Sequence, residues 1–222
     1  MVAQPSIIPP TPSEAEYAAA GERAPIPDAH DPIALFGDWL AAARESEHND
    51  ANAMALATVD ASGLPDVRTL LLKDFGPGGF TFYSNLESAK AHQLAATGKA
   101  AILFHWKSLE RQVRIRGAVR RASDEAADEY FASRARISQI GAWASAQSST
   151  LDDREALKAR VALFTDLFAE DDAIPRPPYW GGYVLVPDTI EFWQGQAYRL
   201  HDRLKFSRGG ESAGWDRIRL NP

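Results

Sequence analysis

The sequence predicts a mainly β protein, an antiparallel barrel with peripheral helices, from three observations. About eight segments show the residue pattern of strands, whereas only three or four show helical periodicity. Short turn sequences, ASG at 61–63 and GPGG at 76–79, join successive strands as hairpins. The chain lacks the regular alternation of strand and helix that is typical of a parallel sheet, so the antiparallel class is favoured.

Composition narrows the class of protein further. The chain has 222 residues, 45% of them hydrophobic, which is enough for one domain with a real core. Its net charge of −6 argues against nucleic acid or an anionic membrane as the main partner. With no cysteine and no metal-binding histidine spacing, we expect neither disulfides nor a metal site. No leader or membrane-spanning run is visible, so we expect a cytoplasmic protein.

The first third of the chain predicts an arm, a helix and a hairpin. Residues 1–30 are rich in Pro, Ala and Glu, and we expect a flexible arm anchored only by Tyr17, followed by a single domain over 31–222. Asp31 and Pro32 mark the start of a helix. Its core face is predicted from the repeat of Ile33, Phe36, Leu40 and Ala43. Strands are then predicted over 54–60 and 65–75, the second with a run of three leucines that indicates either burial on both sides or a bulge.

The remaining elements follow the same rules. A strand over 80–83 leads into a helix from Ser84 to about residue 97, since SNLE at 84–87 has capping-box spacing. Strands over 100–106 and 111–121 form a hairpin, and Ser123 caps the next helix. Another helix begins at Asp152 or Asp153, and strands over 182–193, 198–207 and 215–220 complete the chain.

The run EFWQGQAYRLHDR at 191–203 carries the most unusual chemistry. A strand that begins at Tyr198 places every second residue on one face. These residues are Arg199, His201 and Arg203. Such a cationic row repels itself unless an anion lies against it, and the planar fork of arginine suits phosphates and carboxylates. A solvated edge strand explains the same pattern about equally well.

Two further groups are candidates for anion binding. The predicted helix N-terminus beside Tyr83 carries Lys90 one to two turns along, although an ordinary capped helix explains this pattern too. Tyr130 and Arg134 lie four residues apart and Ser138 follows, a set that can hold a phosphate or can be surface decoration. The glycine-rich signatures of dinucleotide sites, P-loops and hydrolase elbows are absent from the sequence.

Over residues 31–222 the chain resembles the pyridoxamine 5′-phosphate oxidase family. The matching runs are ATVD at 57–60, RTLLLK at 68–73, FYSN at 82–85, FHW at 104–106, RQVRIRG at 111–117, YFASR at 130–134, SQIGAWAS at 138–145, QSS at 147–149, RPPYWGG at 176–182, EFWQG at 191–195 and RLHDR at 199–203. Each run alone is weak, whereas their order and spacing together are specific. The resemblance implies an FMN-binding split β-barrel, a homodimer with FMN at the subunit interface, and a C-terminal segment that serves dimerisation and substrate binding.

The resemblance also implies roles for individual residues. Those that correspond to FMN contacts are Arg68, Thr69, Leu70, Leu71, Lys73, Tyr83, Ser84, Lys90, Gln112, Gln147, Ser148, Trp193 and Arg203. Those that correspond to substrate contacts are Lys73, Tyr130, Arg134, Ser138, Arg199, His201 and, from the arm, Tyr17. Arg199 and His201 are the implied catalytic pair, which holds the pyridine ring over the flavin.

The implied reaction is the oxidation of pyridoxine 5′-phosphate or pyridoxamine 5′-phosphate by O₂ to pyridoxal 5′-phosphate in vitamin B6 metabolism, with hydrogen peroxide as product and ammonia released from the amine. The alternatives are a related flavin oxidase of the phenazine-biosynthesis type and a non-catalytic flavin- or haem-binding split barrel. A phosphate clamp of Tyr130, Arg134 and Ser138 argues against a non-phosphorylated tricyclic substrate.

Three positions depart from the family pattern. Ala89 stands where the family usually has an arginine that binds the FMN phosphate, which predicts FMN binding weaker by about tenfold. Ala135 replaces a usual proline, and Glu14 replaces an arginine that covers the substrate in some members. Closure of the arm over the substrate would therefore lack this arginine in this chain.

Overall fold

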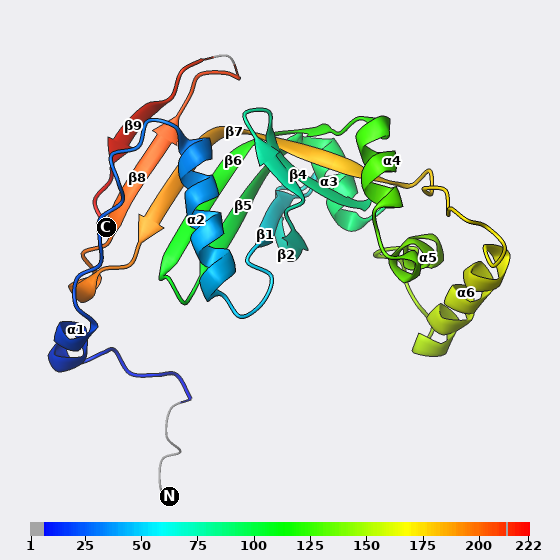
Figure 1. The fold of residues 1–222 in the computed structure, drawn as a ribbon, viewed down its shortest axis with the longest axis horizontal. Coiled ribbons are helices and arrows are strands. Elements are labelled where there is room, and N and C mark those ends of the chain that lie inside the picture. The colour runs from blue at the N-terminus through cyan, green and yellow to red at the C-terminus, as the bar shows by residue number, and fades with distance from the viewer. Residues whose placement is uncertain (1–6, 212) are drawn as a thin grey trace, which may run out of the picture.

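The computed structural model describes residues 7–211 and 213–222, and its central feature is one antiparallel sheet of nine strands (Figure 1). The strands are β1 (Ala53–Val59), β2 (Pro65–Leu71), β3 (Asp74–Gly76), β4 (Gly79–Asn85), β5 (Lys99–Trp106), β6 (Arg111–Arg121), β7 (Trp180–Gln194), β8 (Asp202–Ser207) and β9 (Asp216–Arg219). The helices are α1 (Glu14–Ala20), α2 (Pro32–Ser46), α3 (Ala89–Thr97), α4 (Asp124–Ala132), α5 (Arg136–Ala144), α6 (Arg154–Leu167) and the 3₁₀ turn η1 (Ala197–Arg199). The predicted antiparallel split barrel is confirmed.

The long strand β7 is where the barrel splits. The sheet order is β2-β1-β5-β6-β7-β4-β3, with β8 and β9 branching from β7. One edge of β7 pairs first with β4, over 180–185, and then with β8, over 189–194. The register of β6 against β7 shifts beside Gly117, where a Cβ would lie 1.9 Å from the carbonyl oxygen of Val186. Only glycine fits this close approach of two backbones.

The main core lies between the sheet and α2, which crosses its face in Figure 1. Asp31 accepts hydrogen bonds from the backbone of residues 33 and 34, and Pro32 occupies the first helical position, as the sequence predicts. The buried face of α2 is Leu35, Phe36, Trp39 and Ala43, whereas Ile33 and Leu40 lie at its margin. The ring of Phe36 packs edge-on against Phe80 and Phe104, as aromatic rings prefer.

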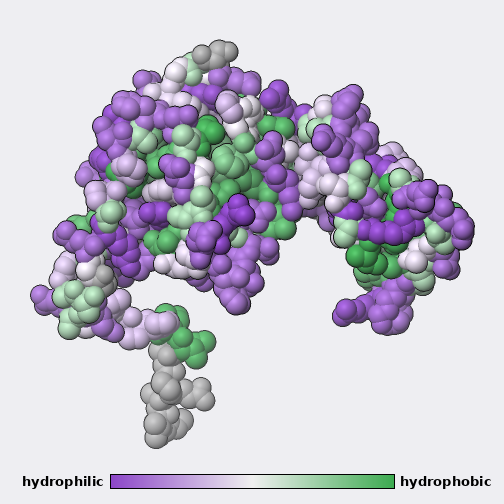
Figure 2. Space-filling model, viewed as in Figure 1, coloured by the Kyte–Doolittle hydropathy of each residue, from purple (hydrophilic) through white to green (hydrophobic). Residues whose placement is uncertain are grey.

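A second apolar cluster supports the helices α4, α5 and α6, which project from the barrel in Figure 1. Its buried members are Phe131, Ile140, Phe168, Ile174 and Trp180. Val161 and Phe164 of α6 pack against this cluster and are partly buried, whereas Leu163 and Leu167 are 62% and 63% exposed. Figure 2 shows apolar residues on the inner side of this projection. In the described part of the chain, no helix is long and apolar enough to cross a membrane.

Three element predictions are wrong in detail. The strand predicted over 65–75 ends at Leu71 and resumes as β3, because Leu72 turns into the core. The capping box predicted at Ser84 does not form, since β4 continues to Asn85 and the N-cap of α3 is Ser88. Residues 198–201 form η1 and a turn rather than a strand.

The N-terminal segment also differs from the expected arm. Ser13 caps α1 with a complete capping box. Beyond α1 the chain packs along the C-terminal strands, where Ile26 is buried and donates its backbone N–H to Asp202. Arg217 makes a salt bridge with Asp28. Tyr17 is therefore one of several anchors of this segment.

Candidate functional site

A cleft of about 790 Å³ opens between the end of β4 and the helices α4 and α5. Ten of the predicted site residues line it: Thr69, Leu70, Leu71, Lys73, Tyr83, Ser84, Tyr130, Arg134, Ser138 and Gln147. Asn85, Ser145 and Trp180 complete its polar and aromatic wall. Residues from three separate parts of the sequence thus meet in one cavity, which is the setting expected for a ligand site.

One wall of the cleft is an aromatic stack that carries two cations. The ring of Tyr83 lies 4.3 Å from that of Tyr130 and 5.4 Å from that of Trp180, both nearly parallel. The Nζ of Lys73 lies 5.7 Å from the Tyr130 ring centre, and the guanidinium of Arg134 lies 4.9 Å from that of Trp180. Flat rings with nearby cations suit a flat, anionic ligand.

Arg134 has an unmet hydrogen-bonding need. Among the described residues, its buried Nη1 has no hydrogen-bond partner. Burial also lowers the pKa of its guanidinium. A buried charged donor without a partner is costly, so the position indicates an anionic ligand in the cleft.

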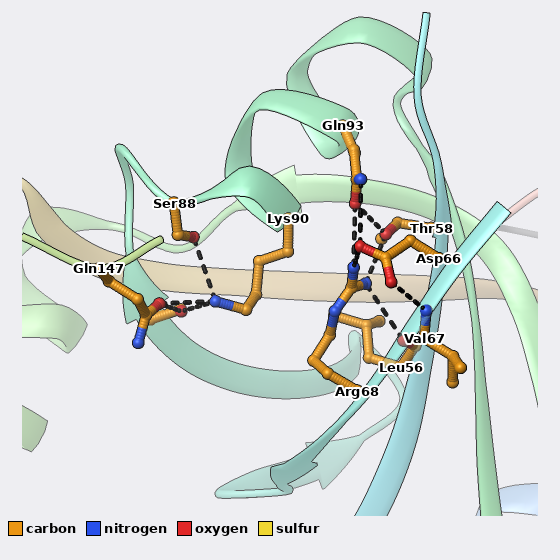
Figure 3. A network of polar contacts seen from close by, with 10 residues as sticks. Leu56, Thr58, Asp66, Val67, Arg68, Ser88, Lys90, Gln93 and Gln147 are labelled. Carbon is orange, nitrogen blue, oxygen red and sulfur yellow. Dashed lines mark hydrogen bonds and ion pairs between the residues drawn. The ribbon is translucent and has the colours of Figure 1, made fainter. Parts of the chain in front are cut away.

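Lys90 is a second buried cation beside the cleft. Its Nζ donates to Ser84 Oγ, Ser88 Oγ and Gln147 Oε1 at 3.1, 3.1 and 2.6 Å (Figure 3). All three acceptors are neutral, so no contacting carboxylate balances the ammonium. Burial, with a smaller contribution from the charge of Arg68, lowers its pKa to about 8. A doubly charged phosphate would supply the missing negative charge.

Arg68 is held rigidly on β2 by its own network. Its guanidinium donates to Leu56 O, Thr58 Oγ1, Asp66 Oδ2 and Gln93 Oε1, as Figure 3 shows. Gln93 and Lys90 lie three residues apart on α3, hence on one face of that helix. Helix α3 thus orients two cations: it carries Lys90, and its Gln93 holds Arg68.

A second group of predicted residues lies on the strands β6, β7 and β8. Gln112, Trp193 and Arg203 are register partners and form one row across the three strands. They line a smaller cavity of about 230 Å³ together with Arg114, Glu191 and Pro222. The row lies on the face of the sheet opposite the α2 core, because its neighbours Val113, Phe192 and Leu204 point into that core.

The predicted catalytic pair lies beside this row, although not on a strand. Tyr198 and Arg199 have φ angles of 55° and 62°, a left-handed conformation that is uncommon for residues with side chains. The turn lets the ring of His201 pack on Trp193 at 4.5 Å, and Arg199 Nε donates to the hydroxyl of Tyr17 at 3.3 Å. The single cationic face predicted for residues 199, 201 and 203 is therefore wrong.

The structure defines the protonation of His201. Its Nδ1 accepts a hydrogen bond from the backbone N–H of Gln196 at 3.2 Å. Burial and the charge of Arg199 lower the pKa of the imidazole below its ordinary value. The ring is therefore neutral near pH 7 with its proton on Nε2, which leaves Nε2 as a donor.

Within one chain, the cleft residues and the row of Gln112, Trp193 and Arg203 do not line a common cavity. Trp180, in the wall of the cleft, and Trp193, in the row, lie near opposite ends of β7 (Figure 1). At about 3.3 Å per residue, they are up to roughly 40 Å apart along the strand. Ser148, with a φ of 72°, is exposed and lines neither cavity.

Sequence reasoning missed three residues that the geometry brings into these sites. Trp180 closes the aromatic stack, Gln93 holds Arg68, and Glu191 holds Arg203. Glu191 had a usable signal, because a carboxylate on a strand that is otherwise buried needs a cationic partner. Gln93 had no such signal in the sequence, since its role depends on how α3 packs against β1.

The fold and the site define a split β-barrel of the flavoprotein oxidoreductase class. Residues 40–168 match the family model described as pyridoxamine 5′-phosphate oxidase, and residues 180–222 match that of the pyridoxine 5′-phosphate oxidase C-terminal dimerisation region. The chain therefore belongs to the pyridoxamine 5′-phosphate oxidase family.

Individual relatives agree with this assignment. The chain is 57% identical to a pyridoxine/pyridoxamine 5′-phosphate oxidase of Hyphomonas neptunium, over 98% of this chain and 99% of the relative. It is 53% identical to the protein of that name from Caulobacter vibrioides, over the full length of both chains. Among solved structures, PhzG from Burkholderia lata in complex with tetrahydrophenazine-1-carboxylic acid superposes with a TM-score of 0.81 at 33% identity, over 88% of this chain and 94% of that one.

A more distant structure shares the fold. An FMN-binding protein of Nostoc punctiforme, described as related to pyridoxamine 5′-phosphate oxidase, has a TM-score of 0.69 at 18% identity. The match covers 87% of this chain and all of that one. At this identity the likeness supports the split-barrel fold alone.

Proposed function

We propose that this protein is an FMN-dependent oxidase that converts pyridoxine 5′-phosphate and pyridoxamine 5′-phosphate to pyridoxal 5′-phosphate. The observation that carries the proposal is the buried Nη1 of Arg134, which has no hydrogen-bond partner in the described part of the chain and lies in a cleft that also presents Lys73, Tyr130 and Ser138. Two cations and two hydroxyl groups around one space suit the phosphate of a B6 vitamer.

The residues present also fit FMN. Lys90 supplies a buried ammonium whose contacts are all neutral, and Arg68 is fixed nearby by its network. Tyr83 and Ser84 line the same cleft, and Gln112, Trp193 and Arg203 form the separate row. When bound, FMN would supply the two-electron acceptor that O₂ regenerates with formation of hydrogen peroxide.

We infer that a complete site needs two copies of the chain. The cleft and the row lie near opposite ends of β7, and two of the three row residues, Trp193 and Arg203, lie in the region that matches the dimerisation model. A homodimer that places the row of one subunit over the cleft of the other would unite the phosphate-binding and ring-binding residues. Each dimer would then hold two equivalent sites.

The catalytic roles follow from charge and position. Arg199 would press the pyridine ring flat, and neutral His201 would donate from Nε2 to a ring substituent. The substrate loses a hydride from C4′ and a proton from the attached hydroxyl or amino group, so the alcohol becomes an aldehyde directly. The amine becomes an imine, which water hydrolyses to the aldehyde and ammonia. Orientation of this kind can contribute about 7 to 11 kcal/mol.

The likeness to PhzG favours a second candidate, oxidation of a reduced phenazine precursor. A tricyclic carboxylic acid carries no phosphate, so it would leave Arg134 and Lys73 without a dianionic partner. Relative rates on the two substrate classes separate the candidates.

The proposal is tested with the purified protein. Bound FMN gives a yellow protein, and we expect pyridoxine 5′-phosphate to yield equal amounts of pyridoxal 5′-phosphate and hydrogen peroxide. Arg134→Ala should raise KM for the phosphorylated substrate by at least about tenfold. Bound flavin without turnover of either vitamer would contradict the proposal and favour a carrier or sensor.

A further inference from the structure

Glu191 is a buried carboxylate at the centre of a hydrogen-bonded cluster next to the row. Its exposure is 7%, and it lies on β7 two residues from Trp193. Its Oε1 accepts from Arg203 Nε at 3.0 Å and from Arg203 Nη2 at 2.8 Å. Its Oε2 accepts from Arg114 Nη2. One carboxylate therefore binds two guanidinium groups from the two neighbouring strands.

Register explains why the cluster forms. Arg114, Glu191 and Lys205 are partners across β6, β7 and β8, one step along from the row of Gln112, Trp193 and Arg203. Side chains at alternate positions share a face, so both rows lie on the same side of the sheet. Arg203 reaches diagonally from its own row to the carboxylate in the next. The cluster therefore fixes Arg203, which is the residue at one end of the row.

The cluster restrains Arg203 but does not use all of its N–H donors. A guanidinium has five N–H groups. Three of them point to partners in this chain: Nε and one Nη2 proton to Glu191, and one Nη1 proton to the carbonyl oxygen of Asn221 at 2.8 Å. Among the described residues, one proton on Nη1 and one on Nη2 have no partner.

We propose that Glu191 is a positioning residue for the flavin site, which holds Arg203 so that its two remaining N–H groups meet FMN. This inference rests on the proposed function, because it takes FMN as the ligand of the row. Both carboxylate oxygens of Glu191 accept from arginines, so its role is exerted through Arg203.

The charge of Glu191 is part of this role. Burial by itself would raise the pKa of the carboxyl group, but the hydrogen bonds and charges of Arg114 and Arg203 lower it below the ordinary value of 4.5. The carboxylate is therefore ionised at neutral pH, and it offsets the repulsion between the two guanidinium groups. An uncharged amide of the same shape would lose this effect while keeping most of the packing.

The test is a double-mutant cycle read out as the dissociation constant for FMN. The holoenzyme and its Glu191→Gln, Arg203→Ala and doubly substituted variants are diluted, and the released flavin is followed by its fluorescence. We expect Glu191→Gln alone to raise the dissociation constant by about tenfold or more. In the Arg203→Ala background the same change should have almost no effect, since its partner is gone. Glu155→Gln, which removes an exposed carboxylate on α6, is the matched control and should leave FMN binding unchanged.

Each outcome decides the inference. Unchanged FMN affinity in Glu191→Gln overturns it, and so does an equal loss in both backgrounds, which would indicate general destabilisation. If Glu191→Gln does not fold, Glu191→Asp keeps the charge but withdraws the carboxylate, and wild-type affinity in that variant also overturns the inference. A wild-type protein that does not bind FMN refutes the proposed function itself, and this inference with it.

Discussion

The hydroxyl of Tyr17 accepts a hydrogen bond from Arg199 Nε at 3.3 Å, although 182 residues separate them in the sequence. The ring of Tyr17 also packs on Tyr198 at 5.5 Å. Helix α1 is thereby attached to the turn that carries the proposed catalytic pair. The N-terminal segment lies where it can orient Arg199 before the substrate arrives.

Removing this hydroxyl should weaken substrate binding. We expect Tyr17→Phe to raise KM for pyridoxine 5′-phosphate by about two- to tenfold with a smaller change in kcat, because one hydrogen bond that orients Arg199 is lost. Steady-state kinetics measure both constants. Tyr198→Phe, which keeps the ring contact and the Tyr17 hydroxyl, is the control. A wild-type KM in Tyr17→Phe would show that α1 does not assist binding.

The imidazole of His201 should titrate below its ordinary pKa of 6.5, because burial and the charge of Arg199 disfavour its cation. The folded state therefore favours the neutral ring. The stability that this group contributes is present above pH 6.5 and is lost as the pH falls through that value towards the lower folded pKa. Histidine NMR signals, assigned with a His201→Asn variant, give the midpoint. A midpoint above 6.5 would contradict the lowered pKa of His201 and the neutral ring that follows from it.

Lys90 should lower the stability of the ligand-free protein and strengthen the binding of FMN. Its pKa of about 8 in the ligand-free protein means that FMN affinity should fall as the pH rises above that value. Between pH 8 and the ordinary value of 10.5 the unfolded chain keeps a proton that the folded chain has lost, so the ligand-free protein gains stability over this range. Lys90→Met should accordingly raise the melting temperature of the FMN-free protein and weaken FMN binding by at least about tenfold. Thermal unfolding and FMN titration test both, and unchanged affinity would refute the role of Lys90.

Replacement of Ala89 by arginine should strengthen the binding of FMN. It is exposed at the first position of α3, next to Lys90. We expect Ala89→Arg to tighten FMN binding by about tenfold, because a hydrogen bond to a charged group contributes about 1.5 to 3 kcal/mol. Ala89→Gln, which has a long neutral side chain, controls for bulk. Equal affinities of the wild type and the arginine variant would mean that the phosphate lies out of reach of residue 89.

Most of the fold could be predicted from the sequence because its signals are local. Buried and more exposed positions alternate along β1 and along the first part of β6, and Asp31 with Pro32 marks the start of α2. The errors occur where tertiary contacts override a local pattern. Ser84 has capping-box spacing, yet its backbone pairs with Gly181 in the sheet. Residues 198–201 alternate like a strand, but left-handed angles at Tyr198 and Arg199 turn the chain instead.

The sequence indicated which residues line the cleft, but not how their side chains contact one another. The motif residues of the cleft do meet in one cavity, as the resemblance implies. Two features depend on packing that no local pattern encodes: the three neutral acceptors around Lys90, and the buried Nη1 of Arg134, which has no hydrogen-bond partner among the described residues. Gln93 and Glu191 escaped notice because each acts on an arginine that lies far away in sequence or on another strand.

The most direct test of a site shared between two chains is activity in mixed dimers. Arg134→Ala disables the cleft and Arg199→Ala disables the C-terminal group, so neither homodimer should turn over efficiently. After subunit exchange, each heterodimer should contain one site with both substitutions and one wild-type site, and the mixture should recover about a quarter of the wild-type rate. No recovery, in a mixture shown by mass spectrometry to contain heterodimers, would mean that both groups act within one chain and would contradict the composite site.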